Sequence, residues 1–328
     1  MQQAGSSIKI SVLIPAYNCG ATLRETLDSV LAQTHAPHEI LVMDDGSTDE
    51  TSRILDFYKP RITAFRQSNT GAGEARNALI LRAQGELVAF LDSDDIWHPR
   101  YLEVQAQLFH AHPQAVAVFT SHSTFYGEGE ITWTCKPFDL PRTVEVIEPP
   151  AFLRQYNETP EYFYPSFCCV PRQVLRAMGD QPFRGRIAEE CYFFNFLSLF
   201  GPVVRASTSL VVYRIRERSL LSDPVKLREG TVRSFELLEE HFKKCSDMRI
   251  YYAFEQAVAS RRRDYAKALL GVYQVSEARR QLRKSLRSGQ SLLSAAKSLR
   301  SLSLSYLPRA LQPNWRVSAR TPRDPISS

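Results

Sequence analysis

The first 95 residues alternate between short apolar runs and segments with helical spacing, and this pattern restricts the fold more than any other feature. The apolar runs cover residues 8–16, 39–43, 62–66 and 87–91. Each is followed by a segment in which apolar side chains recur three or four residues apart, as on one face of a helix. Four such alternations predict βαβ units, and therefore an α/β fold with a mainly parallel sheet flanked by helices.

Polar residues follow three of these runs. Tyr17 comes after the first run, Asp44 and Asp45 after the second, and an acidic cluster at 92–95 (Asp-Ser-Asp-Asp) after the fourth. In open parallel sheets, ligands bind beyond the carboxyl ends of the strands. We therefore expect these polar groups to meet at one edge of the sheet.

The acidic cluster has two interpretations. Three carboxylates at the end of a buried strand repel one another, and a bound cation would relieve this repulsion. Oxygen ligands suit Mg²⁺ or Mn²⁺, and such an ion commonly completes its coordination with substrate phosphates. Alternatively, the acids only cap the helix that follows Pro99. The cluster alone leaves both interpretations open.

The segment after the second run also has an ordinary explanation. A turn and a helix N-cap account for Ser47 to Asp49. They do not require two adjacent acids, one of which could accept a hydrogen bond from a uracil imide or a ribose hydroxyl. The segment lacks a GxGxxG, which argues against a Rossmann dinucleotide site.

Three long segments, taken together, resemble the N-terminal half of the family 2 glycosyltransferases. They are Ser11–Asn18 (SVLIPAYN), Leu27–Thr51 (ending DDGSTDET) and Asn69–Glu103 (containing GEARNALI and FLDSDDIW). The resemblance covers about residues 8–125, with further matches near 165–222. It implies the GT-A fold, a nucleotide-diphosphate sugar donor with a uracil base favoured, a divalent metal, Mn²⁺ or Mg²⁺, and inversion of the anomeric centre.

The resemblance also implies roles for individual residues. Asp45 matches the acid that contacts the base, and Asp94 matches the metal ligand of the DxD motif. Asp92 matches the acid near the sugar or ribose and is the second candidate metal ligand. Arg76 matches a residue near the nucleotide, although its position also fits a charge on a helix surface. The complete set of expected donor-binding residues is Pro15, Ala16, Tyr17, Asp45, Gly71, Arg76, Asn77, Asp92, Ser93, Asp94 and Arg216.

The catalytic base of the family is usually the Asp of a Glu-Asp pair that opens a later helix. Here the pair is Glu189-Glu190, so Glu190 is the expected base. A carboxylate at this position can still accept the proton of an acceptor hydroxyl. The alternative is an exposed acid pair favoured by the helix dipole. A second departure is Arg216, which stands where relatives often have His and could bind the diphosphate electrostatically.

The charge distribution singles out the end of the sequence. From Arg261 onward there are 15 Lys and Arg against three Asp and Glu, while the preceding residues have 26 against 32. Because the basic excess is confined to one region, nucleic-acid binding is not expected. Residues 290–311 combine leucines with Lys297 and Arg300 and contain no acid. This pattern fits a basic amphipathic helix on an anionic membrane surface, or a helix packed on the protein with a solvated basic face.

We expect a GT-A catalytic domain over residues 1–225, with a donor half at about 8–125 and an acceptor half at about 126–225. A helical extension at 226–288 and a basic amphipathic tail at 289–328 follow. The beginning of the sequence has no signal-peptide pattern, no apolar run is long enough to cross a membrane, and the six cysteines have no metal-binding spacing. The expected location is cytoplasmic, with peripheral contact at the inner face of the cell membrane.

The sequence thus predicts transfer of a sugar to an acceptor hydroxyl by an inverting single displacement, in cell-surface polysaccharide or glycolipid synthesis. The acceptor is expected to be a saccharide or a lipid-linked molecule. Two alternatives remain. A non-catalytic nucleotide-sugar binder is suggested by the departures at Glu190 and Arg216. A nucleotidyltransferase is disfavoured because Pro15–Asn18 occupies the place of a glycine-rich, basic loop.

Overall fold

The computed structural model describes residues 8–126, 143–215, 223–288 and 292–307. Contacts between Cα atoms divide the chain into two compact units. The first comprises Met1–Glu148, Pro160–Arg184 and Phe200–Glu217. The second comprises Pro149–Thr159, Gly185–Leu199 and Arg218–Ser328. Arg216 and most of the predicted tail lie outside the described residues.

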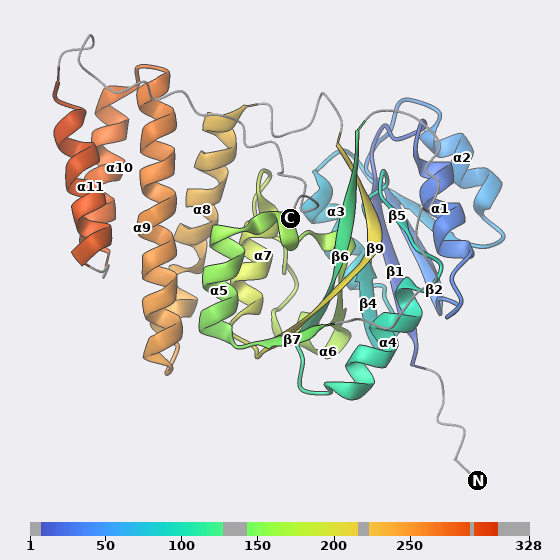
Figure 1. Cartoon of the computed structure of the whole chain (residues 1–328). Coiled ribbons are helices and arrows are strands. Elements are labelled where there is room, and N and C mark those ends of the chain that lie inside the picture. The colour runs from blue at the N-terminus through green and yellow to red at the C-terminus, as the bar shows by residue number, and fades with distance from the viewer. Residues whose placement is uncertain (1–7, 127–142, 216–222, 289–291, 308–328) are drawn as a thin grey trace. The chain divides into compact units, whose positions relative to one another are not determined.

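The first unit begins with the predicted alternation (Figure 1). Four parallel strands lie in the order β3-β2-β1-β4. Every residue of β1 is buried, as a run that is apolar on both faces requires. The strands are β1 (Ile10–Ala16), β2 (Glu39–Asp44), β3 (Thr63–Arg66) and β4 (Leu87–Phe90). The intervening helices are α1 (Leu23–Leu31), α2 (Thr51–Tyr58) and α3 (Ala72–Ile80).

The rest of the sheet is mixed, which modifies the expectation of a mainly parallel arrangement. β8 (Cys168–Pro171) enters between β4 and β6 (Ala117–Tyr126) and runs antiparallel to both. β9 (Val203–Ile215) is parallel to β6. Two short strands, β5 (Ile96–Trp97) and β7 (Val144–Ile147), pair with β9 in the antiparallel sense. The remaining elements of this unit are α4 (Tyr101–Ala111), the single turns η1 (Pro160–Tyr162) and η2 (Pro165–Phe167), and α6 (Arg172–Ala177).

The second unit is helical. Asp223 caps α8 by accepting hydrogen bonds from the amides of Val225 and Lys226, and Pro224 occupies the first helical position. Alanine and leucine side chains of α9 and α10 form a core with Val232 and Tyr265. None of the described helices is both long and apolar enough to cross a membrane. The helices are α5 (Pro149–Glu158), α7 (Glu189–Leu197), α8 (Pro224–Lys243), α9 (Met248–Gly271), α10 (Val275–Arg287) and α11 (Leu292–Leu304).

Candidate functional site

The predicted strand ends do meet at one edge of the sheet. β1 lies between β2 and β4, parallel to both, and Ala16 pairs with Asp44 in the register of β1 and β2. The amide of Asp45 donates to the carbonyl of Ala16 over 2.8 Å, which extends the pairing by one residue. The acidic cluster follows β4, the neighbour on the other side of β1. The candidate site is therefore built on the ends of three adjacent strands.

Asp44 has a structural role at this edge. Its carboxylate accepts hydrogen bonds from the Ser47 amide at 2.8 Å and from the Ser52 hydroxyl at 2.7 Å, and it pairs with Arg66 at 2.7 Å. Burial opposes its ionisation, but the hydrogen bonds from Ser47 and Ser52 and the charge of Arg66 together lower its pKa. Asp44 thus holds the turn that leads into α2.

Asp45 organises the loop before α3. Its Oδ1 accepts from the Gln67 side chain at 2.8 Å and from the Thr70 amide at 3.0 Å, and its Oδ2 accepts from the Gly71 amide at 2.8 Å. Gly71 has φ 102°, in the region that favours glycine. The contact of Asp45 with a nucleobase remains a prediction, and Oδ2 is the carboxylate oxygen with a lone pair left for it, because Oδ1 already accepts from Gln67 and Thr70.

The loop after β1 presents one of its predicted residues to solvent. Pro15 and Ala16 are buried, whereas 49% of Tyr17 is exposed. Asn18 has φ 46°, and its amide donates to Ser47 Oγ at 3.0 Å, which ties this loop to the one after β2. Of these residues, Tyr17 is therefore the one available for stacking on a ligand.

Two residues of α3 connect it to other parts of the first unit. Arg76 forms an ion pair with Asp92, and its guanidinium lies 5.3 Å from the ring centre of Phe183. With an exposed fraction of 4%, Arg76 is not a surface charge. Both polar atoms of the Asn77 side chain bond to the backbone of Phe183, at 2.7 and 3.0 Å. Asn77 thus ties α3 to the backbone of Phe183. Its direct contact with the donor remains a prediction.

The acidic cluster is fixed largely through its backbone. The Asp92 amide donates to Ser166 Oγ at 2.9 Å, and the Ser93 carbonyl accepts from Thr22 Oγ1 at 2.9 Å. The Asp95 amide donates to the Asp92 carbonyl at 3.1 Å, which closes the turn. These bonds make the cluster a turn rather than the start of a helix, since α4 begins only at Tyr101.

Asp95 was predicted only as a member of the acidic cluster, and its partner Arg214 was not predicted as a site residue. Asp95 is fully buried and accepts from the Arg214 amide at 3.1 Å. Arg214, on β9, also pairs with Glu25 at 2.6 Å and donates to the Asp94 carbonyl at 3.2 Å. The only available signal was the position of Arg214 in the same segment as Arg216.

The donor set of the cluster fits a cation. Burial, followed by the charges of Asp94 and Asp92, raises the pKa of Asp95 well above its usual value. Asp95 Oδ2 is buried without a hydrogen-bond partner among the described residues. No group of three or more His, Cys, Asp and Glu side chains in the described part of the chain is arranged as a complete metal site. A cation at the cluster would therefore have to take some of its ligands from a bound substrate.

An aromatic group adjoins the acidic cluster. His122 stacks on Phe167 with ring centres 4.4 Å apart, and Tyr164 stacks on Tyr213 at 4.9 Å. The pKa of Tyr213 is raised, first by burial and then by the electrostatic influence of Tyr164 and of all three acids of the cluster. Burial lowers the pKa of His122 to about 4, so this imidazole is neutral at physiological pH.

Glu190 belongs to the second unit. It lies with Glu189 in the first turn of α7, which follows Ala188 in a left-handed conformation with φ 58°. The Ala188 carbonyl accepts from Ser234 Oγ of α8 at 3.2 Å. A Cβ at Gly230 would come within 2.6 Å of the Ile187 carbonyl oxygen, so a glycine is needed for this close packing. The start of α7 is thus well supported, while the role of Glu190 as base stays a prediction.

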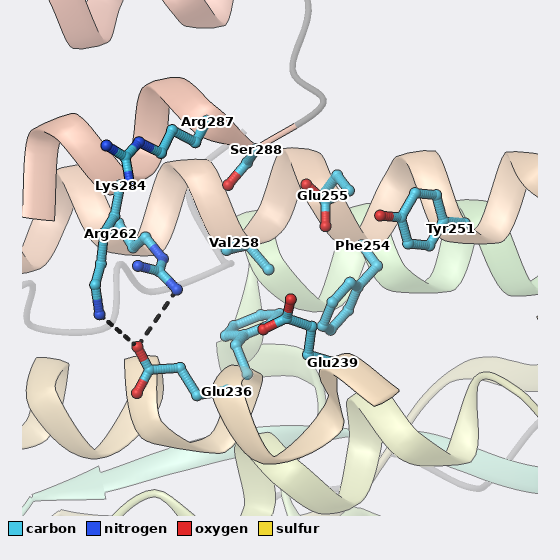
Figure 2. Close-up of a pocket in the computed structure, with 11 residues that line it drawn as sticks. Glu236, Glu239, Tyr251, Phe254, Glu255, Val258, Arg262, Lys284, Arg287 and Ser288 are labelled. Carbon is cyan, nitrogen blue, oxygen red and sulfur yellow. Dashed lines mark hydrogen bonds and ion pairs between the residues drawn. The ribbon is translucent and has the colours of Figure 1, made fainter. Parts of the chain in front are cut away.

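A cavity of about 580 Å³ also lies in the second unit, along α8, α9 and α10. Figure 2 shows Glu236 facing Arg262 and Lys284 across it. Glu236 Oε1 lies 3.3 Å from Arg262 Nη2 and 3.3 Å from Lys284 Nζ. Three acids and three bases line the cavity. The charges balance, so nothing in it favours a cationic or an anionic ligand.

Two comparisons with known sequences agree. The model of glycosyl transferase family 2 matches residues 11–178. The Escherichia coli protein named UDP-Glc:alpha-D-GlcNAc-diphosphoundecaprenol beta-1,3-glucosyltransferase WfgD is 42% identical over 101 residues, which cover 30% of this chain and 40% of that protein. The matches span less than half the length of the curated relatives.

Solved structures share the fold over most of the chain. Staphylococcus aureus TarS 1-349, in complex with UDP-GlcNAc, has a TM-score of 0.61 at 19% identity, covering 91% of this chain and 90% of that one. The mannosyltransferase PcManGT from Pyrobaculum calidifontis, in complex with GDP-Man and Mn²⁺, has a TM-score of 0.56 at 18% identity, covering 93% and 82%. The expected GT-A fold is confirmed. Because the family model matches more than half of this chain, the chain belongs to glycosyltransferase family 2.

Proposed function

We propose that this protein transfers a sugar from a nucleotide-diphosphate sugar to an acceptor hydroxyl. The observation that carries the proposal is the meeting of Tyr17, Asp45 and the acidic cluster at the ends of three adjacent strands. Ligands of open α/β sheets bind at such an edge. The names of the similar proteins favour UDP as the carrier and a saccharide or lipid-linked acceptor.

The donor would lie across this edge. The exposed Tyr17 ring would stack on the base, and Asp45 Oδ2 would accept a hydrogen bond from the imide N–H of uracil with its remaining lone pair. Gly71, whose amide is already bonded to Asp45, allows the backbone to approach the ligand closely. Arg216 would attract the diphosphate electrostatically.

Asp94, with Asp92, would hold Mn²⁺ or Mg²⁺. The ion would neutralise charge on the diphosphate leaving group. The protein itself also stabilises the charges of the cluster, because Arg76 pairs with Asp92 and the backbone amide of Arg214 donates to Asp95. The buried position of Arg76 keeps this arrangement in place before the donor arrives.

Glu190 would act as the base. Its carboxylate would take the proton of the acceptor hydroxyl while the oxygen attacks the anomeric carbon and the nucleoside diphosphate leaves from the opposite side. One displacement of this kind inverts the anomeric configuration. The first turn of a helix favours the charged form of the carboxylate, and the acceptor must supply the hydroxyl to this position.

The test is donor binding followed by donor hydrolysis. The melting temperature should rise with UDP-sugars in the presence of Mn²⁺, and hydrolysis should release UDP. Asp94→Ala should reduce hydrolysis at least about 100-fold, while the control Asp56→Ala, an exposed acid on α2, should leave it unchanged. No stabilisation by any nucleoside diphosphate would refute the donor site. Binding without hydrolysis or transfer to any acceptor would favour a non-catalytic binder.

A further inference from the structure

Helix α11 packs against its own unit through serines and Leu302, and exposes three of its leucines. The buried side chains along this face are Ser294, Ser298 and Ser301, and Ser305 continues it beyond the helix. On the opposite face, Leu292, Leu293 and Leu299 are 91%, 69% and 53% exposed. An amphipathic helix of a globular protein normally buries the apolar face, so this orientation needs a physical cause.

The cause is a pair of arginines on the neighbouring helices. Arg263 of α9 is buried and donates to Ser294 Oγ at 2.8 Å and to Ser298 Oγ at 3.2 Å. Arg279 of α10 donates to the Ser305 carbonyl at 2.7 Å, and its guanidinium lies 3.8 Å from the ring centre of Tyr306. A buried guanidinium requires hydrogen-bond acceptors, which serine hydroxyls and carbonyls provide and leucines do not.

The exposed face of α11 is also basic. Lys297 and Arg300 lie among the exposed leucines, and α11 contains no acidic residue. Beyond α11, residues 308–328 contain four arginines and one acid. Contact between two copies through this face would bury cations with no acid on the face to pair with them. An anionic bilayer surface instead accepts leucines into its apolar layer and attracts Lys and Arg at its headgroups.

We propose that the outer face of α11, formed by Leu292, Leu293, Lys297, Leu299 and Arg300, binds the surface of an anionic phospholipid bilayer. The helix would lie in the plane of the interface while Arg263 and Arg279 hold its serine face to the protein. This goes beyond sugar transfer, and the contact itself does not depend on it. It would carry the enzyme to acceptors that are embedded in a membrane.

The test is co-sedimentation of the full chain with vesicles of phosphatidylglycerol and phosphatidylcholine, and with vesicles of phosphatidylcholine alone. We expect binding to the first kind, at least ten-fold weaker binding to the second, and release by salt. The triple variant Leu292→Ser, Leu293→Ser, Leu299→Ser and the double variant Lys297→Glu, Arg300→Glu should each reduce binding at least ten-fold. Melting curves should match the wild type because these side chains are exposed.

Matched controls separate this face from general surface effects. Leu237→Ser removes an exposed leucine of α8, and Arg53→Glu with Lys59→Glu reverses two exposed charges, one on α2 and one directly after it. Both controls should bind vesicles as the wild type does. Equal binding by the α11 variants would overturn the proposal, as would association of copies in solution that these variants abolish without any vesicle binding. Donor-induced thermal shifts should persist in every variant, so failure here is distinguishable from failure of the proposed function.

Discussion

Arg76, in the middle of α3, forms an ion pair with Asp92, the first acid after β4. The arginine is buried and the carboxylate is partly exposed, so the pair spans the boundary between the core and the candidate site. The ring of Phe183 contributes a cation–π contact to the same guanidinium. This arrangement gives Asp92 a cation that belongs to the protein itself.

The coupling of Arg76 and Asp92 can be measured with a double-mutant cycle. Arg76→Gln should lower the free energy of unfolding by about 3 kcal/mol, because it leaves the carboxylate without its partner. The double variant with Asp92→Asn should recover at least about 1 kcal/mol of the summed loss. Urea denaturation provides the measurement. Additive losses would mean that the pair contributes no net coupling.

Gly71→Ala should weaken nucleotide binding as well as the fold. Alanine at φ 102° costs about 1–3 kcal/mol of strain and would move the amide that bonds to Asp45. Gly179, with φ 90° and open space around it, provides the control. Both alanine variants should lose stability in urea, but only Gly71→Ala should reduce the thermal shift produced by UDP. Equal shifts in the two variants would argue against a role for the Asp45 loop.

Glu190 can be separated from its neighbour by charge-neutral substitutions. Glu190→Gln should lower the turnover rate by about 10²–10⁴-fold, the usual contribution of a general base, with little change in donor binding. Glu189→Gln changes the same first turn of α7 and should lower it far less. The measurement is transfer to an acceptor once one is found. Full activity of Glu190→Gln would remove it from the mechanism.

Because of His122, we expect the folded protein to lose stability in mild acid. The pKa of its imidazole is lowered from 6.5 to about 4 by burial, so the unfolded chain takes up a proton at a higher pH than the folded protein does. The neutral imidazole makes its full contribution to the free energy of unfolding above pH 6.5. This contribution decreases as the pH falls toward 4, by about 3 kcal/mol in all. His122→Phe should remove about 2 kcal/mol of the difference between pH 7 and pH 5 in urea titrations, because Asp95 contributes equally to both proteins. An unchanged pH dependence would show that His122 is protonated in the folded state.

The local pattern of the sequence was enough to predict the strands and helices of the first 95 residues and the edge of the site. Apolar runs that are buried on both faces became β1, β2 and β4, because each carries its own hydrophobicity and β-branched side chains. Parallel βαβ connections then bring the strand ends to one edge whatever the loops contain. The polar groups at residues 17, 45 and 92–95 could be placed together for this reason.

The partners of those groups depend on the tertiary structure. Asp95 contacts Arg214, 119 residues away in the sequence, and Asn77 contacts Phe183, 106 residues away. The local spacing of apolar residues does not predict such distant contacts. The same holds for α11. Its spacing predicted an amphipathic helix, but the buried Arg263 and the partly buried Arg279 of other helices hold its serine face to the protein, while Leu292, Leu293 and Leu299 face solvent. The helical pattern of a segment depends on residues close together in the sequence. Which face of the helix packs on the protein depends also on distant polar groups, because these must be hydrogen-bonded when they are buried.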